Sequence, residues 1–205
     1  MAEHQPDNGR RGLLVAASTV AGGVAAVAAG VPFVASMLPS ERARAAGAPV
    51  EADISQLAPG ERMTVEWRGK PVWIVRRTPE MLDTMKKNID KVSDPESKKV
   101  MQPNYAKNEF RSIKPEYLVL VGICTHLGCS PVEKFQAQAE AFASDWKGGF
   151  YCPCHGSLFD LAGRVYKNKP APDNLVVPPH KFLADGKILI GVDANAGEKN
   201  DKGAA

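Results

Sequence analysis

Two short stretches decide how this sequence is interpreted: "CTHLGC" at residues 124–129 and "CPCHGS" at residues 152–157. They hold all four cysteines of the chain and two of its four histidines. The first has the pattern Cys-x-His-x-x-Cys and the second has the pattern Cys-x-Cys-His, so each supplies two thiols and one imidazole. Groups of these types at such spacing bind a metal or form disulfides. The two stretches therefore predict loops that carry the chemistry of the protein.

A structural zinc ion is the first interpretation of these loops. Four of the six groups could make a tetrahedral site with two thiolates and two imidazoles. Such a site leaves two cysteines unexplained. It also gives no reason for the matching patterns, Cys-x-His in the first loop and Cys-x-x-His in the second.

A 2Fe–2S cluster accounts for the pattern better than zinc does. One iron would take the thiolates of Cys124 and Cys152, and the other would take the imidazoles of His126 and His155. Each loop then gives one ligand to each iron, so the cluster is held between the two loops. Replacing two of four thiolates by neutral imidazoles makes the oxidised cluster neutral, and a neutral centre accepts an electron more readily than an anion does.

Two cysteines remain after this assignment, Cys129 in the first loop and Cys154 in the second. We expect them to form a disulfide that fastens the two loops together over the cluster. An exported domain permits such a bond. Short loops that contain glycine have little packing of their own, so the link would support the site.

Both boxes closely resemble those of the Rieske iron–sulfur proteins of bacterial ubiquinol–cytochrome c reductase (cytochrome bc) complexes. Related Rieske ferredoxins and ring-hydroxylating dioxygenases keep the Cys-x-His and Cys-x-x-His parts but lack the disulfide pair. The stretch "NKPAPDNLVVPP" at residues 168–179 is similar to the proline-rich loop of the family, which covers the cluster from a third side. Lys169 departs from the glycine that relatives often have there. The stretch "PSERARAAGAPVEADIS" at residues 39–55 is similar to the family's hinge and first strand.

The resemblance also implies roles for single residues. His155 is expected to contact the quinol, with His126 beside it at the exposed tip and Leu127 in an apolar docking surface around them. Ser157 is expected to donate its hydroxyl to a bridging sulfide, which stabilises the reduced cluster. Phe159 stands where many relatives have a tyrosine whose hydroxyl bonds a ligand thiolate. We therefore expect a lower reduction potential than in tyrosine-bearing relatives.

For the whole chain, the resemblance implies an electron-transfer subunit of quinol–cytochrome c reductase. Such a subunit oxidises ubiquinol through a high-potential 2Fe–2S cluster, passes the electron to a c-type cytochrome and releases a proton to the periplasm. Its implied partners are cytochrome b, cytochrome c1, ubiquinol and membrane lipid, within a dimeric complex. A ring that binds iron through one nitrogen still carries a proton on the other, so electron and proton uptake are coupled at a ligand histidine.

The N-terminus predicts a membrane anchor. Residues 12–38 contain no charged side chain, and as a helix they would be about 40 Å long, whereas a bilayer core of about 30 Å needs only about 20 residues. Arg10 and Arg11 directly precede this segment and suit a twin-arginine export signal, which carries folded proteins. Positive residues on that side also favour a cytoplasmic N-terminus in the inner membrane and a periplasmic domain. The downstream "ARAAGA" resembles a cleavage site, but the length of the apolar segment favours a retained anchor.

Five segments follow from composition along the chain. We expect a cytoplasmic stub over residues 1–11, a transmembrane helix over 12–38 and a flexible hinge over 39–49. The hinge segment is small, polar and rich in alanine and glycine, and an interfacial helical turn is its alternative. The cluster domain covers residues 50–192. The remainder, 193–205, is expected to be disordered.

Strand patterns dominate inside the domain. "MTVEW" (63–67) alternates apolar and polar residues, as a half-buried strand does. "PVWIVRR" (71–77) and "EYLVLVGI" (116–123) are continuous apolar runs, which indicate strands covered on both faces. "KFLADGKILIG" (181–191) predicts a hairpin with Asp185-Gly186 at its turn.

Two stretches within the domain have helical patterns. "PEMLDTMKKN" (79–88) begins with proline at a favourable first-turn position. "EKFQAQAEAFASDW" (133–146) places Phe135, Ala139, Phe142 and Trp146 on one helical face, which predicts core packing. The predicted fold class is mainly β: a small antiparallel domain with two cluster-binding loops, anchored by one N-terminal helix.

Two other classes of function remain open from the sequence. A Rieske subunit of a periplasmic molybdenum oxidoreductase shares the export signal and the cluster, but it does not need a membrane-packed helix and a hinge. A zinc-stabilised binding module would be colourless when purified. The formal net charge of +3 is mild and the basic residues are spread along the chain, which gives no support to nucleic-acid binding.

Overall fold

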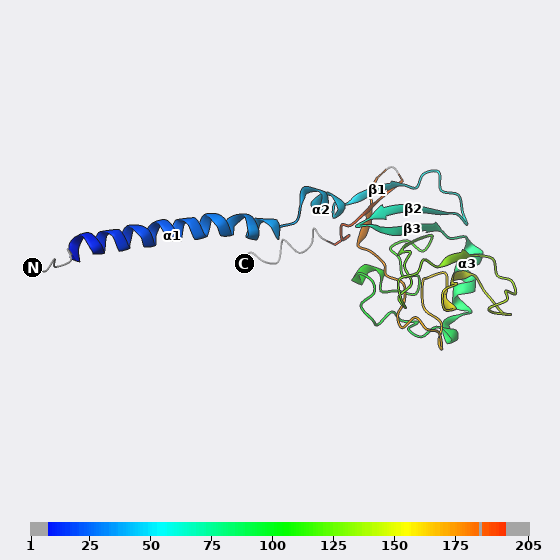
Figure 1. Cartoon of the computed structure of the whole chain (residues 1–205). Coiled ribbons are helices and arrows are strands. Elements are labelled where there is room, and N and C mark those ends of the chain that lie inside the picture. Colours follow the sequence, from blue (N-terminus) through cyan, green and yellow to red (C-terminus); the bar gives the residue numbers. More distant parts are fainter. Residues whose placement is uncertain (1–7, 185, 196–205) are drawn as a thin grey trace, which may run out of the picture. The chain divides into compact units, whose positions relative to one another are not determined.

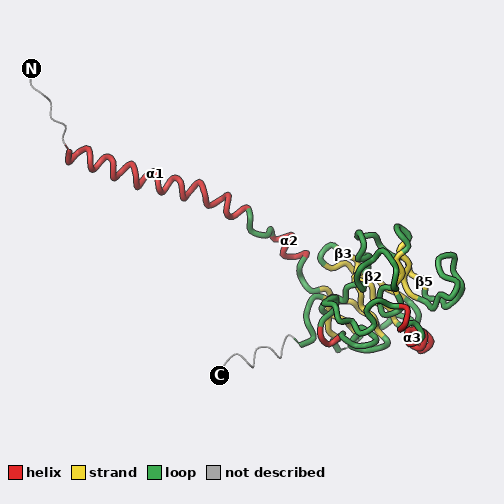
Figure 2. The backbone as a smooth tube through the Cα atoms, turned by 90° about the horizontal axis from the view of Figure 1, so that it is seen from below, coloured by secondary structure: helices red, strands yellow, loops and turns green. Residues whose placement is uncertain are grey.

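The structure is a computed structural model that describes residues 8–184 and 186–195. The chain divides into two compact units, Met1–Ala45 and Ala46–Ala205 (Figures 1 and 2). Most of the predicted cytoplasmic stub and of the predicted disordered tail lie outside the described residues.

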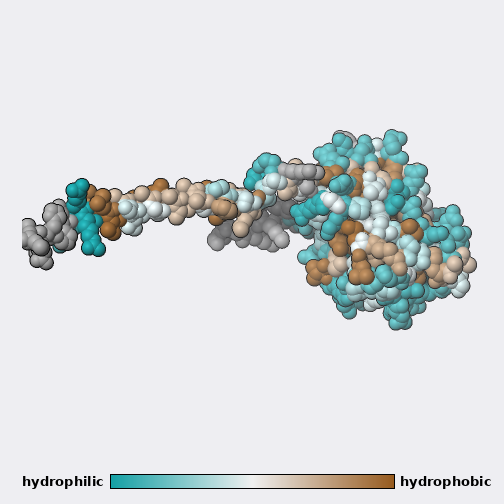
Figure 3. All heavy atoms as spheres, viewed as in Figure 1, coloured by the Kyte–Doolittle hydropathy of each residue, from teal (hydrophilic) through white to brown (hydrophobic). Residues whose placement is uncertain are grey.

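The first unit is built on helix α1 (Asn8–Ser36), which is 29 residues long and contains Pro32. It is the one described helix long and apolar enough to cross a membrane. Figure 3 shows a hydrophilic start followed by apolar and weakly polar colours along the helix. An apolar N-terminal helix is therefore present, although it begins at Asn8 and ends at Ser36. That residues 12–38 cross a membrane stays a prediction.

A second, short helix occupies the segment predicted as a flexible hinge. This helix is α2 (Glu41–Ala46), and it begins where the Ser40 hydroxyl accepts a hydrogen bond from the backbone of Ala43 at 3.2 Å. The helical turn, which was the alternative for this segment, is therefore present. Whether residues 39–49 bend during function stays a prediction.

The second unit contains three antiparallel sheets among its described residues, with strand orders β1-β9-β8, β2-β3-β4 and β5-β6-β7. The predicted fold class, a mainly β domain of antiparallel strands, is confirmed. The strands are β1 (Val50–Asp53), β2 (Arg62–Trp67), β3 (Lys70–Arg76), β4 (Tyr117–Val121), β5 (Val132–Lys134), β6 (Gly149–Cys152), β7 (Ser157–Phe159), β8 (His180–Phe182) and β9 (Lys187–Ile190).

Strands β3 and β4 form the middle of the domain, and their two faces pack into different parts of the core. Alternate residues of a strand point to opposite faces, so each face collects its own set. One set packs with β9, namely Val72, Ile74, Val119 and Val121 against Ile188 and Ile190. The other set packs with β6 and β7, namely Trp73, Val75, Leu118 and Leu120 against Phe150 and Phe159. Burial on both faces explains why these two strands have continuous apolar sequences, as predicted.

The predicted helix over 79–88 is confirmed as α3 (Pro79–Lys86), where the Thr78 hydroxyl accepts a hydrogen bond from the Met81 backbone at 3.3 Å. Two 3-10 turns follow, η1 (Ile89–Lys91) and η2 (Asn104–Ala106). The hairpin predicted over 181–191 is present as the antiparallel pair β8–β9. Gly186 has φ +70°, a left-handed value that suits a turn glycine, while Asp185 lies outside the described residues.

The predicted helix over 133–146 is wrong. The structure has the short strand β5 followed by loop and turns in this region. Three aromatic rings hold the loop: Phe135 packs edge-on against Phe150 at 5.6 Å, and Phe142 stacks on Tyr151 at 4.1 Å. The indole of Trp146 donates a hydrogen bond to the Lys134 carbonyl at 2.8 Å. Core packing of Phe135, Phe142 and Trp146 was therefore predicted correctly, but Ala139, which was predicted on the same face, is exposed. Aromatic packing overrides the helical spacing of this stretch.

Candidate metal centre

The two predicted cluster loops have the same backbone design. The first follows β4 and the second joins β6 to β7. In the first loop, the N–H of Gly128 donates to the carbonyl of Cys124 at 3.1 Å, and in the second the N–H of Gly156 donates to the carbonyl of Cys152 at 2.9 Å. Gly128 has φ +86° and Gly156 has φ +77°, values that favour glycine. A glycine four residues after a cysteine thus closes each loop.

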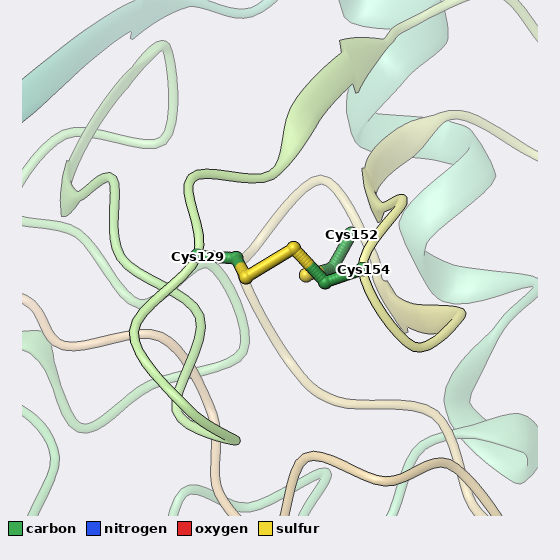
Figure 4. Close-up of side chains that lie close together, drawn as sticks. All are labelled: Cys129, Cys152 and Cys154. Carbon is green, nitrogen blue, oxygen red and sulfur yellow. A yellow bond between two sulfur atoms is a disulfide. The ribbon is translucent and has the colours of Figure 1, made fainter.

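The predicted disulfide between Cys129 and Cys154 is present, with 6.7 Å between the two Cα atoms (Figure 4). The first loop is also closed at its base, because the N–H of Cys124 donates to the carbonyl of Cys129 at 2.7 Å. Both ends of the disulfide therefore sit on loops whose own hydrogen bonds fix their shape.

The two remaining thiols lie on the inner side of the loops. Cys124 is 3% exposed and Cys152 is 2% exposed, and neither is in a disulfide. Burial raises the pKa of the Cys152 thiol, and a hydrogen bond with the Cys124 thiol raises this pKa further. The two thiols therefore contact each other, and the Cys152 thiol loses its proton less readily than a free thiol does.

The two loop imidazoles lie on the outer side. His155 is exposed and His126 is half-buried, and their ring centroids are 4.7 Å apart with the planes at 90°. Leu127, which follows His126 directly, is 71% exposed. A buried thiol pair and an adjacent solvent-facing imidazole pair fit a 2Fe–2S cluster that has different ligands on its two irons.

One alternative set of metal ligands can be set aside. The sulfur atoms of Cys129, Cys152 and Cys154 lie within 4.8 Å of one another (Figure 4). Two of these sulfurs are bonded to each other in the disulfide, so they have no thiolate to give to a metal. The free thiols and the two imidazoles could still form a tetrahedral zinc site on donor chemistry alone.

The proline-rich loop at 168–179 contacts both cluster loops. The hydroxyl of Thr125 donates to the Asp173 carbonyl at 2.6 Å, and the N–H of Ala171 donates to the Ser157 hydroxyl oxygen at 3.0 Å. The proline-rich loop therefore lies against both cluster loops, in the position that the resemblance implied. The role of Thr125 could not be predicted, since one hydroxyl between two cysteines has no preferred partner until the loops are folded. Lys169, which departs from the family pattern, is half-buried in this loop.

Ser157 and Phe159 are both fully buried on β7. The Ser157 oxygen accepts the hydrogen bond from Ala171, so the Ser157 hydroxyl can still donate its own proton to another acceptor. Phe159 belongs to the same buried core as Cys124 and Cys152, and its ring brings no hydrogen-bond donor there. These positions agree with the predicted roles, which remain predictions.

Comparison with known proteins decides between the cluster and zinc. Residues 48–180 match the family model "Rieske [2Fe-2S] domain", and residues 1–40 match "Ubiquitinol-cytochrome C reductase Fe-S subunit TAT signal". The chain is 63% identical over 184 residues to the ubiquinol–cytochrome c reductase iron–sulfur subunit of Allochromatium vinosum, covering 90% of this chain and 89% of that protein. The chain belongs to the Rieske iron–sulfur subunits of bacterial ubiquinol–cytochrome c reductase.

Other relatives are similar to this Rieske subunit over most of its length. The iron–sulfur subunit of Bradyrhizobium diazoefficiens is 40% identical, with 89% of this chain and 94% of that protein covered. Among solved structures, a hyperthermophilic respiratory Complex III chain is 29% identical with a TM-score of 0.46, covering 86% of this chain and 98% of that one. The Rieske subunit therefore carries a 2Fe–2S cluster, has a Tat signal and belongs to a respiratory cytochrome bc1 complex, which implies cytochrome b and cytochrome c1 as partners.

Proposed function

We propose that this Rieske subunit takes one electron from ubiquinol, passes it to a c-type cytochrome and releases the coupled proton on the periplasmic side. The observation that carries the proposal is the two-sided site. Its thiols are buried, whereas His155 is exposed and His126 is half-buried beside it. A substrate at the tip therefore meets imidazole rings first.

The ligand set that we propose is Cys124 and Cys152 on one iron and His126 and His155 on the other. The geometry supports it because the thiols contact each other and the rings are neighbours. The cluster, when bound, supplies a one-electron acceptor whose histidine ligation gives it a high potential. The disulfide and the proline-rich loop hold the two loops in the positions that this ligand set requires.

His155 is the proposed quinol contact. Its exposed ring has one nitrogen that would bind iron and a second nitrogen that, once it has lost its own proton, can accept a hydrogen bond and a proton from a quinol hydroxyl. Leu127, which follows His126 directly and is 71% exposed, offers apolar surface for docking. Oxidation of a quinol to a quinone removes two electrons, so the second electron leaves by another path in the complex.

We further propose that α1 is a retained single-pass anchor in the inner membrane. Arg10 and Arg11 lie at its start, which supports a cytoplasmic N-terminus and a periplasmic Rieske domain. Lipid contact along α1, a dimeric complex and a head that moves between cytochrome b and cytochrome c1 complete the proposal.

The test uses the detergent-solubilised complex. Ubiquinol is added, and reduction of the c-type haem is followed together with the EPR signal of the cluster. We expect His155→Ala to abolish both the signal and haem reduction, whereas His180→Asn, a matched change of a buried histidine outside the loops, keeps both. Haem reduction at the wild-type rate in the His155→Ala complex would exclude the proposed function.

A further inference from the structure

Three arginine side chains are buried in the half of the domain that holds the site. The exposed fractions are 2% for Arg77, 0% for Arg111 and 1% for Arg164. Asp160, at 0%, is the only carboxylate buried to this degree in the described part of the chain. Guanidinium groups stay charged at neutral pH, and buried charges are normally paired. The group therefore has two more positive than negative charges.

The guanidinium of Arg111 forms hydrogen bonds with backbone oxygens rather than with a carboxylate. It donates to the carbonyls of Ala162 at 2.9 Å and of Leu175 at 2.7 Å, and to the side chain of Gln102 at 3.1 Å. Arg111 has φ +49°, a left-handed value that costs energy for a residue with a Cβ. The fold thus keeps this arginine inside at a local backbone cost.

Arg77 is satisfied in the same way. Its guanidinium donates to the carbonyls of Pro115, Phe110 and Leu161 at 2.8–3.0 Å and to the Ser112 hydroxyl at 2.8 Å. Burial lowers the pKa of Arg77 to about 9, and it lowers the pKa of Arg111 to about 10. Both values are above neutral pH, so both side chains keep their charge.

The third arginine uses the buried carboxylate. The Nε atom of Arg164 donates to Asp160 at 2.7 Å, and Asp160 also accepts from the backbone of Ala162 and of Arg164. Asp94, which is half-buried, also acts on Arg111, but its two oxygens accept from the backbone of Lys98 and Lys99. The charges of Arg77 and Arg111 thus have no carboxylate bonded to them among the described residues.

Two of the groups that accept hydrogen bonds from these arginines belong to the same part of the core as the thiols. The carbonyls that accept from Arg77 and Arg111 include those of Leu161 and Leu175, which share one buried cluster with Cys124 and Cys152. Asp160 follows β7 directly, three residues after Ser157. Charges inside a protein are screened by salt much less than surface charges, so they act over longer distances.

We propose that the unpaired charges of Arg77 and Arg111 raise the reduction potential of the cluster by stabilising the extra negative charge of its reduced form. Asp160 opposes them and limits the rise. The inference depends on the cluster site, and it does not depend on which quinol or cytochrome reacts there.

The test is an EPR-monitored redox titration of the full-length protein in detergent. Asp160→Asn removes the buried negative charge with almost no change in size, and we expect the midpoint potential to shift upward. Arg111→Gln removes a positive charge, and we expect a downward shift. Arg111→Lys keeps the positive charge but loses the planar guanidinium group and some of its hydrogen bonds. The midpoint potential of the cluster in this variant should therefore stay closer to wild type than in Arg111→Gln.

A surface control separates buried from exposed charge. Lys98→Gln removes one positive charge from the exposed Lys98–Glu96 pair. At high salt, the midpoint potential of this variant should equal that of the wild type, whereas the shifts at Asp160 and Arg111 should persist. Equal shifts in Arg111→Gln and Arg111→Lys, or a fall or no change in Asp160→Asn, would overturn the proposal. Potentials are compared only among variants with the wild-type EPR line shape. If the variants at one of the two positions, Asp160 or Arg111, do not keep the cluster, the proposal is judged by the direction of the potential shift at the other position.

Ubiquinol oxidation by detergent-solubilised complexes that contain the same variants reports on the proposed function separately. A complex that contains a variant with a shifted potential can still reduce the c-type haem. If the wild-type complex fails to oxidise ubiquinol, the variants can still show the predicted shifts in potential. The two proposals therefore fail under different outcomes.

Discussion

At the scale of the residue, Phe159 is the position where one substitution should change the reduction potential of the cluster most directly. It is fully buried in one core with Cys124 and Cys152. We expect Phe159→Tyr to add a hydroxyl that donates to a ligand thiolate and raises the midpoint potential by tens of millivolts, since about 59 mV corresponds to a tenfold change in a one-electron equilibrium. Redox titration measures the shift, with Phe142→Tyr on the neighbouring loop as control. An unchanged or lower potential in Phe159→Tyr would refute the assigned role.

Gly122, two residues before Cys124, is required for a close contact with Trp73. A Cβ atom at Gly122 would lie 2.2 Å from the indole ring. That ring cannot retreat, because Trp73 is 2% exposed and stacks on Phe150 at 5.2 Å. We expect Gly122→Ala to lower the unfolding free energy by roughly 1–3 kcal/mol, the usual cost of overpacking a core.

Thermal or denaturant unfolding measures this loss, and iron content per chain shows whether the first cluster loop is displaced with it. Gly23→Ala is a matched control, because a Cβ at Gly23 on α1 would meet nothing within 4 Å. Wild-type stability in Gly122→Ala would show that the indole ring moves more freely than its packing indicates.

His180 predicts a specific acid sensitivity. Its ring is fully buried, and burial lowers its pKa below the ordinary 6.5, while the bond to the Pro178 carbonyl at 2.8 Å and the charge of Asp193 oppose this. The unfolded chain therefore binds a proton near pH 6.5 and the folded chain does so only at lower pH. The stabilising effect of neutral His180 is present above pH 6.5 and is lost as the pH falls toward the folded pKa, by up to about 1.4 kcal/mol per pH unit.

His180→Asn removes this titration while its amide can still donate to the Pro178 carbonyl. We expect the slope of unfolding free energy against pH to become shallower below pH 6.5 than in the wild type, as measured by denaturant unfolding between pH 5 and pH 7.5. The ligand histidines are common to both proteins and cancel in the comparison. Parallel slopes would contradict the assignment to His180.

At the scale of the element, the disulfide is the part of the site that joins one loop to the other. Cys129 and Cys154 are 25 residues apart in sequence, and closing a loop of that size contributes about 3 kcal/mol. We expect the double change of Cys129 and Cys154 to alanine to lower stability by about this amount and to speed loss of the cluster in air. Iron release followed by visible absorption measures the second effect.

The proline-rich loop keeps its own bonds in that variant, because Thr125 and Ser157 still hold Asp173 and Ala171. The loops should therefore still bind the cluster, only less durably. Cluster lifetime equal to wild type would show that these hydrogen bonds alone hold the two loops together.

Elements with a strict pattern could be predicted from the sequence, and elements held by distant aromatic packing could not. The continuous runs of β3 and β4 indicated burial on both faces, which the two halves of the core confirm. Residues 133–146 had helical spacing, yet Phe135 and Phe142 pack on Phe150 and Tyr151 of β6 instead. A single sequence does not show which distant strand an aromatic residue will meet.

The same limit applies to the site. Cysteine and histidine spacing indicated the disulfide partners, which the structure confirms, and a ligand set that stays a prediction, because those residue types have few other uses at such spacing. Thr125 and the buried arginines were not foreseen. Their partners are backbone carbonyls of Asp173, Leu161 and Leu175, and any residue can supply a carbonyl.

At the scale of the whole molecule, the division into two units is the feature that the proposed function uses. The boundary falls between Ala45 and Ala46, at the end of α2. An electron carrier that serves two partners has to move between them, and a short helix whose described side chains are exposed can unwind or bend more easily than the packed sheets. The segment 39–49 is therefore where we expect the motion to occur.

Replacing Ala45, Ala46 and Gly47 with proline tests this expectation. Proline fixes φ and removes backbone N–H donors, so the segment can neither keep α2 intact nor sample the range of conformations that it has now. We expect turnover of ubiquinol–cytochrome c reduction to fall several-fold, while the EPR spectrum and midpoint potential of the cluster stay unchanged, because the Rieske domain from β1 onward is untouched. Gly47→Ala, which keeps the N–H donors, is the matched control. Wild-type turnover in the proline variant would mean that the electron reaches its acceptor without motion about this segment.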